Sequence, residues 1–269
     1  MVLTGRPTAT LGLPTANAGQ WTAALAAGGL VLLAALVSAV LLTWNGRLSE
    51  AEQHYNAGVE LQMQGRIEEA VAAYDEALRG DPELAVAYYN RANAYADLEQ
   101  HERAIQDYDA STRSSGRFAE AHANRGIAYF RLGETARAVE DYTEAVRLDP
   151  ELFRVYNNRG IAYEHLGQHE RAIEDYTAVI RLSPDRTQAL FSRAAAYGRI
   201  GQYAQAAADY EEVVRLAPGR PEAYASRAIS HALHGDEEAA KEDVDRALAL
   251  GFDAAVMERL LWNVSGISK

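Results

Sequence analysis

Residues 119–152 read AEAHANRGIAYFRLGETARAVEDYTEAVRLDPEL, and this stretch decides the fold. Small and aromatic side chains recur in it at spacings of three and four, as they do on one face of a helix. These side chains are Gly126, Tyr129, Ala138, Tyr142 and Ala145. Gly133 interrupts the pattern and Pro150 ends it, because glycine favours a turn and proline cannot continue a helix. The stretch therefore predicts two amphipathic helices, over 120–132 and 135–148.

The same block recurs along the chain with a period of 34 residues. Four residue types keep this period: Arg91, Arg125, Arg159, Arg193 and Arg227; Asp107, Asp141, Asp175, Asp209 and Asp243; Tyr95, Tyr129, Tyr163 and Tyr197; Ala70, Ala104, Ala138, Ala172, Ala206 and Ala240. A fixed period of this length indicates a repeat architecture, in which each unit is too small to bury its own apolar face and stacks on its neighbours.

This pattern of small, aromatic, alanine and terminal proline residues resembles the tetratricopeptide repeat (TPR). The resemblance predicts six repeats, over 51–84, 85–118, 119–152, 153–186, 187–220 and 221–254. Residues 255–269 follow as a predicted capping helix and tail. The expected fold is all-α: an α-solenoid of six TPR helix-turn-helix repeats with this capping helix, preceded by one transmembrane helix.

The predicted transmembrane helix comes from the segment before the repeats. Its core, residues 22–43, is almost wholly apolar, and no charged residue occurs between Arg6 and Arg47. Twenty-two helical residues span about 33 Å, enough for a hydrocarbon core of about 30 Å. Trp21 and Trp44 bracket the run, as interfacial indoles do. We expect a tail over 1–20, an uncleaved anchor over 21–44 and a linker over 45–50; a cleaved signal peptide is the competing interpretation.

The side of the membrane is nearly undetermined, because basic residues flank the span on both sides. The expectation is a single-pass protein of a bacterial inner membrane, with a slight preference for periplasmic repeats. Small residues in the span, such as Ala24 and Gly28, are compatible with close approach of two anchor helices and hence with a homo-oligomer.

The net charge and the residue composition argue against several classes of function. The chain has a net charge of −12, which disfavours nucleic acid as a ligand because such binding draws on a basic face. There is no cysteine, so disulfides and thiol catalysis are excluded. We find no phosphate-binding glycine loop, no nucleophile elbow and no singular acid and base cluster. The sequence therefore predicts a protein that is not an enzyme and that has no cofactor and no metal.

The periodic arginines and aspartates predict a structural ladder. Each aspartate follows its arginine by sixteen residues, which places the two on successive helices of one unit. The pair is expected to set the register of the stack, either within a unit or between adjacent units. Five regular copies suit a structural role better than catalysis, which needs one singular arrangement.

The TPR resemblance also implies a partner-binding surface. In this family, recurring positions of the first helix of each unit face a concave groove, and those positions here predict a site for a protein or peptide. They are Tyr55, Tyr89, Asn90, Asn93, Asn124, Ile127, Phe130, Arg131, Arg154, Asn157, Asn158, Ile161, Phe191 and Arg199. About half are expected to contact a ligand, and the others to pack helices together.

These expectations combine into one functional hypothesis: a membrane-tethered scaffold that holds a protein or peptide partner, in assembly of a membrane complex. The carboxylate-gripping mode of some TPR adaptors fits poorly, because Tyr89 and Asn158 stand where cations are needed. The alternative is a self-associating structural module whose groove receives a terminal segment of another copy.

Overall fold

The computed structural model describes residues 48–114, 118–183 and 186–267, and within these ranges the chain forms thirteen helices and no strand. It divides into two compact units, Met1–Pro82 and Glu83–Lys269, which are described separately.

The first unit contains one helical hairpin, made of α2 (Glu50–Met63) and α3 (Ile67–Gly80). Ser49 begins α2 with a capping box: its hydroxyl accepts from the amide of Glu52, whose carboxylate accepts from the amide of Ser49. The buried ring of Tyr74 on α3 packs against α2 at Gly58, where a β-carbon would lie 2.5 Å from the ring. A glycine at that position is what lets the two helices of this hairpin approach.

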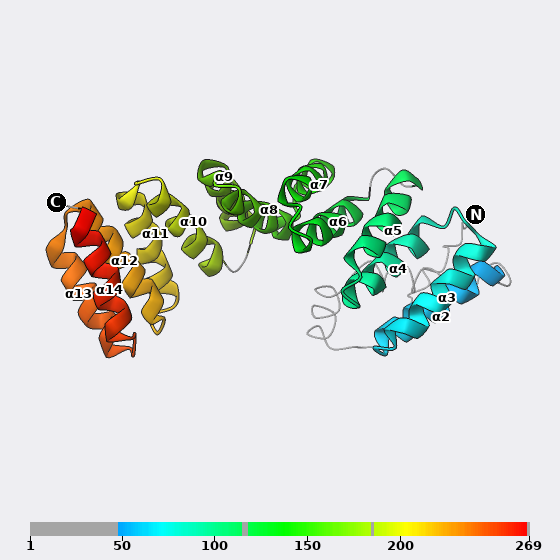
Figure 1. Cartoon of the computed structure of the whole chain (residues 1–269), viewed down its shortest axis with the longest axis horizontal. Coiled ribbons are helices and arrows are strands. Elements are labelled where there is room, and N and C mark those ends of the chain that lie inside the picture. Colours follow the sequence, from blue (N-terminus) through cyan, green and yellow to red (C-terminus); the bar gives the residue numbers. More distant parts are fainter. Residues whose placement is uncertain (1–47, 115–117, 184–185, 268–269) are drawn as a thin grey trace, which may run out of the picture. The chain divides into compact units, whose positions relative to one another are not determined.

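The second unit contains five more hairpins and a final helix (Figure 1). The hairpins are α4 (Ala85–Asp97) with α5 (His101–Ser114), α6 (Ala119–Arg131) with α7 (Thr135–Leu148), α8 (Phe153–His165) with α9 (His169–Leu182), α10 (Thr187–Arg199) with α11 (Tyr203–Leu216), and α12 (Pro221–His234) with α13 (Glu237–Ala249). The final helix is α14 (Ala254–Ile267). We call the first helix of each hairpin the leading helix and the second the trailing helix.

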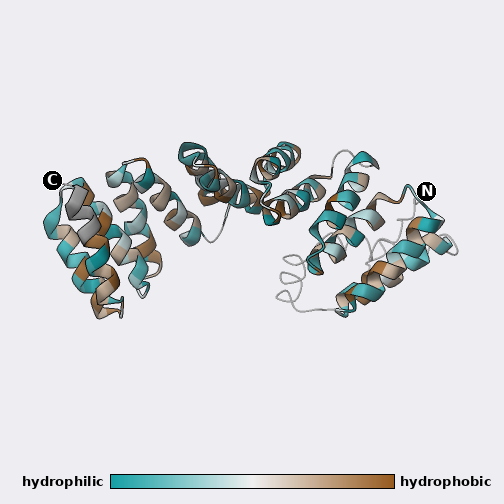
Figure 2. Cartoon of the chain, viewed as in Figure 1, coloured by the Kyte–Doolittle hydropathy of each residue, from teal (hydrophilic) through white to brown (hydrophobic). Residues whose placement is uncertain are grey.

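Each trailing helix in this unit packs on the leading helix of the next hairpin, as α5 does on α6 and α7 on α8. Helix α14 covers the segment predicted as a cap, and it packs on α12, with Met257 buried against Tyr224 and Ala247. Hydrophobic and hydrophilic residues are mixed along every described helix (Figure 2), as expected for helices that each bury one stripe.

The interior of the hairpins is built from alanine and tyrosine. Ala104, Ala138, Ala172 and Ala206 are fully buried, and the tyrosine four residues after each is at most 5% exposed. The alanines let two helices approach closely and the rings fill the remaining space, which accounts for the conserved spacing of these residue types within the chain.

The turns inside the hairpins use a left-handed residue. Gly133, Gly167, Gly201 and Gly235 all have positive φ, between 69° and 93°. Glu99 occupies the equivalent place in the hairpin of α4 and α5 with a φ of 59°, which is strained for a residue with a β-carbon.

None of the helices among the described residues is both long and apolar enough to cross a bilayer. The predicted span 22–43 lies outside the described residues.

Candidate functional site

Within each hairpin of the second unit, the periodic arginine and the periodic aspartate form a bidentate ion pair. In the hairpin of α8 and α9, Arg159 Nε lies 2.9 Å from Asp175 Oδ2, and Arg159 Nη2 lies 2.7 Å from Asp175 Oδ1. The same two contacts occur between Arg193 and Asp209 and in the equivalent pairs of the other hairpins. The ladder is therefore a set of pairs within hairpins, which settles the alternative that the sequence left open.

The same arginines also reach back to the preceding hairpin. Arg159 Nη1 donates to the hydroxyl of Thr143 at 3.1 Å, and Arg193 Nη1 donates to that of Thr177 at 2.9 Å. Arg125 makes the equivalent contact with Asp109. One guanidinium thus joins both helices of its own hairpin to the trailing helix before it, because its five N–H donors point in several directions.

Residues 109, 143 and 177 keep the 34-residue period, but sequence reasoning did not single them out. Their residue type changes from aspartate to threonine, so only the period, and not residue identity, could have found them.

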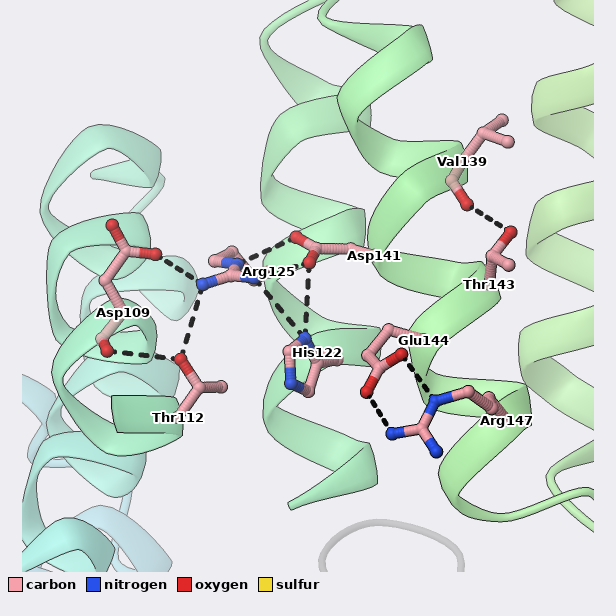
Figure 3. Close-up of polar contacts among 9 residues, drawn as sticks. All are labelled: Asp109, Thr112, His122, Arg125, Val139, Asp141, Thr143, Glu144 and Arg147. Atoms are coloured by element: carbon pink, nitrogen blue, oxygen red, sulfur yellow. Dashed lines mark hydrogen bonds and ion pairs between the residues drawn. The ribbon is translucent and has the colours of Figure 1, made fainter. Parts of the chain in front are cut away.

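The ion pair between Arg125 and Asp141 has an additional neighbour, His122 (Figure 3). Arg125 lies between Asp109 of α5 and Asp141 of α7, and His122 Nδ1 lies 3.3 Å from both Asp141 Oδ1 and Arg125 Nη2. Burial raises the pKa of Asp141, but the hydrogen bonds from Arg125 and His122 outweigh it and hold the pKa below its ordinary value. At Asp175, which lacks such a histidine, burial prevails over the Arg159 hydrogen bond and the pKa is raised.

Three residues predicted to bind a partner form an internal polar network with Tyr108. Tyr108 Oη donates to Asn93 Oδ1 at 2.6 Å, and Asn124 Nδ2 lies 3.0 Å from Asn93 Oδ1 and 3.1 Å from Tyr89 Oη. Burial raises the pKa of Tyr89, opposed by its hydrogen bonds to the two asparagines. The network joins α4, α5 and α6, so it contributes to packing between two hairpins.

The position of Asn124 has the same role further along the chain. Burial raises the pKa of Tyr176 and of Tyr210 on the trailing helices, and hydrogen bonding with Ser192 and with Ser226, respectively, opposes the rise. The serine at this position of α10 and of α12 therefore lies beside the buried tyrosine of the hairpin before it.

The predicted partner-binding residues fall into three exposure classes. Tyr55, Tyr89 and Asn90 are buried. The half-buried ones are Asn93, Asn124, Phe130, Asn157, Asn158 and Phe191. The exposed ones are Ile127, Arg131, Arg154, Ile161 and Arg199. The role of all fourteen in binding stays a prediction.

Side-chain contacts link successive leading helices on the face that carries the exposed residues. The ring of Phe130 on α6 meets that of His165 on α8 edge-on, with centroids 5.0 Å apart. Arg199 Nε on α10 lies 4.0 Å from Glu164 Oε1 on α8. Residues near the carboxyl ends of α6, α8 and α10 therefore form one surface, which we call the leading-helix face.

An open cleft of about 620 Å³ lies on another part of the unit, lined by residues of α7, α8 and α9. Arg159, Tyr163, Arg171 and Asp175 line it together with Glu174. None of the predicted partner-binding residues does. No group of three or more potential metal ligands occurs among the residues that the structure describes.

Comparisons with known proteins identify the repeats. Tetratricopeptide repeat models match residues 123–187, and residues 85–116 with 187–220; a TPR repeat model matches residues 63–99. No curated protein matches the chain by sequence.

Solved structures share the fold. YrrB, described as a TPR protein with an unusual peptide-binding site, is 22% identical with a TM-score of 0.64, over 70% of this chain and 96% of that one. The carboxy-terminal part of a TPR repeat-containing protein from Cytophaga hutchinsonii is 18% identical with a TM-score of 0.65, over 73% of this chain and 78% of that one. Pseudomonas aeruginosa pilF is 18% identical with a TM-score of 0.60, over 79% and 97% of the two chains.

The family matches together span more than half of the chain, and they fall on the hairpins whose alanine, tyrosine and glycine positions build the fold described above. The chain belongs to the tetratricopeptide repeat family.

Proposed function

We propose that this protein is a membrane-tethered scaffold without catalytic activity, which holds a protein or peptide partner on its leading helices during assembly of a membrane complex. The partner contacts the leading-helix face, and residues 22–43 anchor the chain in the bilayer.

The observation that carries the proposal is a pair of exposed aliphatic side chains at equivalent places on neighbouring leading helices. Ile127 is 38% exposed and Ile161 is 37% exposed. Neither side chain belongs to the interior of the hairpins, which consists mainly of alanine and tyrosine with a few valines and leucines. Apolar side chains of this kind, among half-buried amides such as Asn158, suit contact with a partner's backbone and side chains.

Support for the tether comes from the apolar run 22–43 and its flanking tryptophans. An anchor would confine the partner to the vicinity of the membrane and so raise its local concentration. The proposal places the repeats on the periplasmic side of a bacterial inner membrane.

Site-specific cross-linking in native membranes tests partner binding. A photoreactive amino acid is placed in the full chain at Ile127, and in a second variant at Arg181, an exposed position on the trailing helix α9. We expect a discrete protein adduct from position 127 and none from position 181. Equal adducts from both positions, or none from either, would contradict binding at the leading-helix face.

Membrane fractionation tests the anchor, and a mass measurement tests the alternative of self-association. The full chain should resist extraction of membranes at alkaline pH, and a variant lacking residues 22–43 should be released; recovery of both in the soluble fraction would refute the anchor. An adduct at position 127 that contains only this chain, together with a mass that grows with concentration, would favour the self-associating module instead.

A further inference from the structure

Charge is segregated between leading and trailing helices in the middle of the second unit. Helices α6, α8 and α10 together carry six arginines and two glutamates, whereas α7, α9 and α11 carry five arginines and nine acidic residues. Three of the six arginines belong to the ladder, and the others are Arg131, Arg154 and Arg199. A chain with a net charge of −12 therefore places exposed cations on its leading helices.

Two arginines on the trailing helices α7 and α11 pair with a glutamate of their own helix. Arg147 pairs with Glu144 three residues away, and Arg215 pairs in the same way with Glu212. Among the described residues, Arg131 has no carboxylate within ion-pair distance, and the contact of Arg199 with Glu164 is at the 4.0 Å limit. Much of the charge of Arg131 and Arg199 therefore remains available to an incoming anion.

One exposed aliphatic residue lies beside one of these cations, and the other lies on the next leading helix. Ile127 precedes Arg131 by one helical turn on α6, so the two share a face. On α8, Ile161 precedes His165 by the same step, and His165 contacts Phe130 beside Arg131. Ile127 and Arg131 on α6 thus lie near Ile161 and His165 on α8, and Arg199 on α10 lies beyond Glu164 of α8.

We propose that the leading-helix face binds an extended acidic segment that carries branched aliphatic side chains, with its carboxylates at Arg131 and Arg199 and its aliphatic groups against Ile127 and Ile161. This inference rests on the proposed function and specifies its partner. An extended chain covers about 3.3 Å per residue, so about ten residues reach about 33 Å, comparable with three helices of about 10–12 Å diameter side by side.

The test uses the full chain in detergent micelles and a fluorescent, end-blocked peptide of about ten residues, rich in glutamate and containing two isoleucines. Two comparison peptides carry lysine in place of glutamate, or serine in place of isoleucine. Fluorescence anisotropy measures binding at low and at physiological salt. The variants are Arg131→Glu and Arg199→Glu, with Arg181→Glu as the matched charge reversal on a trailing helix.

We expect the acidic peptide to bind about tenfold more tightly than the lysine or the serine peptide, and more weakly as salt rises. Arg131→Glu and Arg199→Glu should each weaken it about fivefold, whereas Arg181→Glu should leave it unchanged. Circular dichroism should show the same helix content in all three variants. Blocking the peptide ends removes any contribution from a terminal carboxylate.

Equal binding of the acidic and lysine peptides, no binding of the acidic peptide, or equal losses in all three variants would overturn the inference. Those results leave the proposed function standing if position 127 still cross-links to a protein in native membranes. Loss of that cross-link is the separate result that refutes the proposed function.

Discussion

Replacing Arg159 by alanine tests the ladder most directly. The change removes both hydrogen bonds to Asp175 and the bond to Thr143. The Asp175 side chain is only 5% exposed, so its carboxylate loses these donors at a site where it has little contact with water. A carboxylate stays behind in the hairpin of α8 and α9 with its burial uncompensated.

Removing one partner of a buried pair costs about 3–5 kcal/mol, and we expect about 3 kcal/mol because Arg159 is 13% exposed. For a chain of this size, that loss lowers the melting temperature by roughly 6–12 °C. The bond to Thr143 adds a loss of coupling to the preceding hairpin, since stability in repeat proteins depends on nearest-neighbour contacts.

The effect should depend on pH. Burial already raises the pKa of Asp175 in the folded chain, and loss of Arg159 removes the hydrogen bonds that oppose this rise. A carboxyl group whose pKa is raised by folding holds its proton more tightly in the folded state than in the unfolded state. The destabilisation is therefore complete above the folded pKa and shrinks as the pH falls toward the unfolded value of about 3.9.

Urea unfolding followed by far-ultraviolet circular dichroism, at several pH values for both proteins, measures these quantities. Arg181→Ala is the control, because Arg181 is exposed, and its effect should stay within about 0.5 kcal/mol. Adding Asp175→Asn to Arg159→Ala removes the buried charge and should recover part of the loss. An unchanged unfolding midpoint for Arg159→Ala at neutral pH would refute the reasoning.

Four further substitutions test the packing, the turns and a buried hydrogen bond. Gly126→Ala places a β-carbon 2.7 Å from the ring of Tyr142 and should destabilise by about 1–2 kcal/mol, whereas Gly198→Ala, with no atom within 4 Å, should stabilise by about 0.5 kcal/mol; equal midpoints would contradict this. Glu99→Gly relieves a left-handed residue and should raise stability by about 0.5–1 kcal/mol, and a lowered melting temperature would count against strain there. Tyr108→Phe removes a buried hydroxyl's hydrogen bond and should cost about 1 kcal/mol in urea unfolding; no loss would mean that the network adds nothing.

The hairpins could be predicted because their signals are local and repeated. Helix α7 begins and ends at the residues expected from the stretch between Gly133 and Pro150. The ladder aspartates were also predictable, since a fixed separation of sixteen residues places them opposite the arginines. The second contact of Arg159, to Thr143, was not, because residue types at that position vary while the packing position does not.

The candidate binding surface was predictable only as a set of helix positions. Tyr89 and Asn124 stand at positions predicted to face a partner, yet they are hydrogen-bonded to each other between hairpins. Ile127, three residues beyond Asn124 on the same helix, is exposed. Hydrophobicity alone would have predicted that Ile127 is more buried than Asn124, whereas the structure shows the reverse.

The 34-residue period was enough to predict the hairpins and to single out the arginines and aspartates of the ladder, because each depends on residue types at fixed separations along one chain. Only the tertiary structure decided which side chains of the leading helices are buried between helices and which remain exposed. That outcome depends on the neighbouring hairpin that covers each position, and covering a polar group requires a partner that no local pattern specifies.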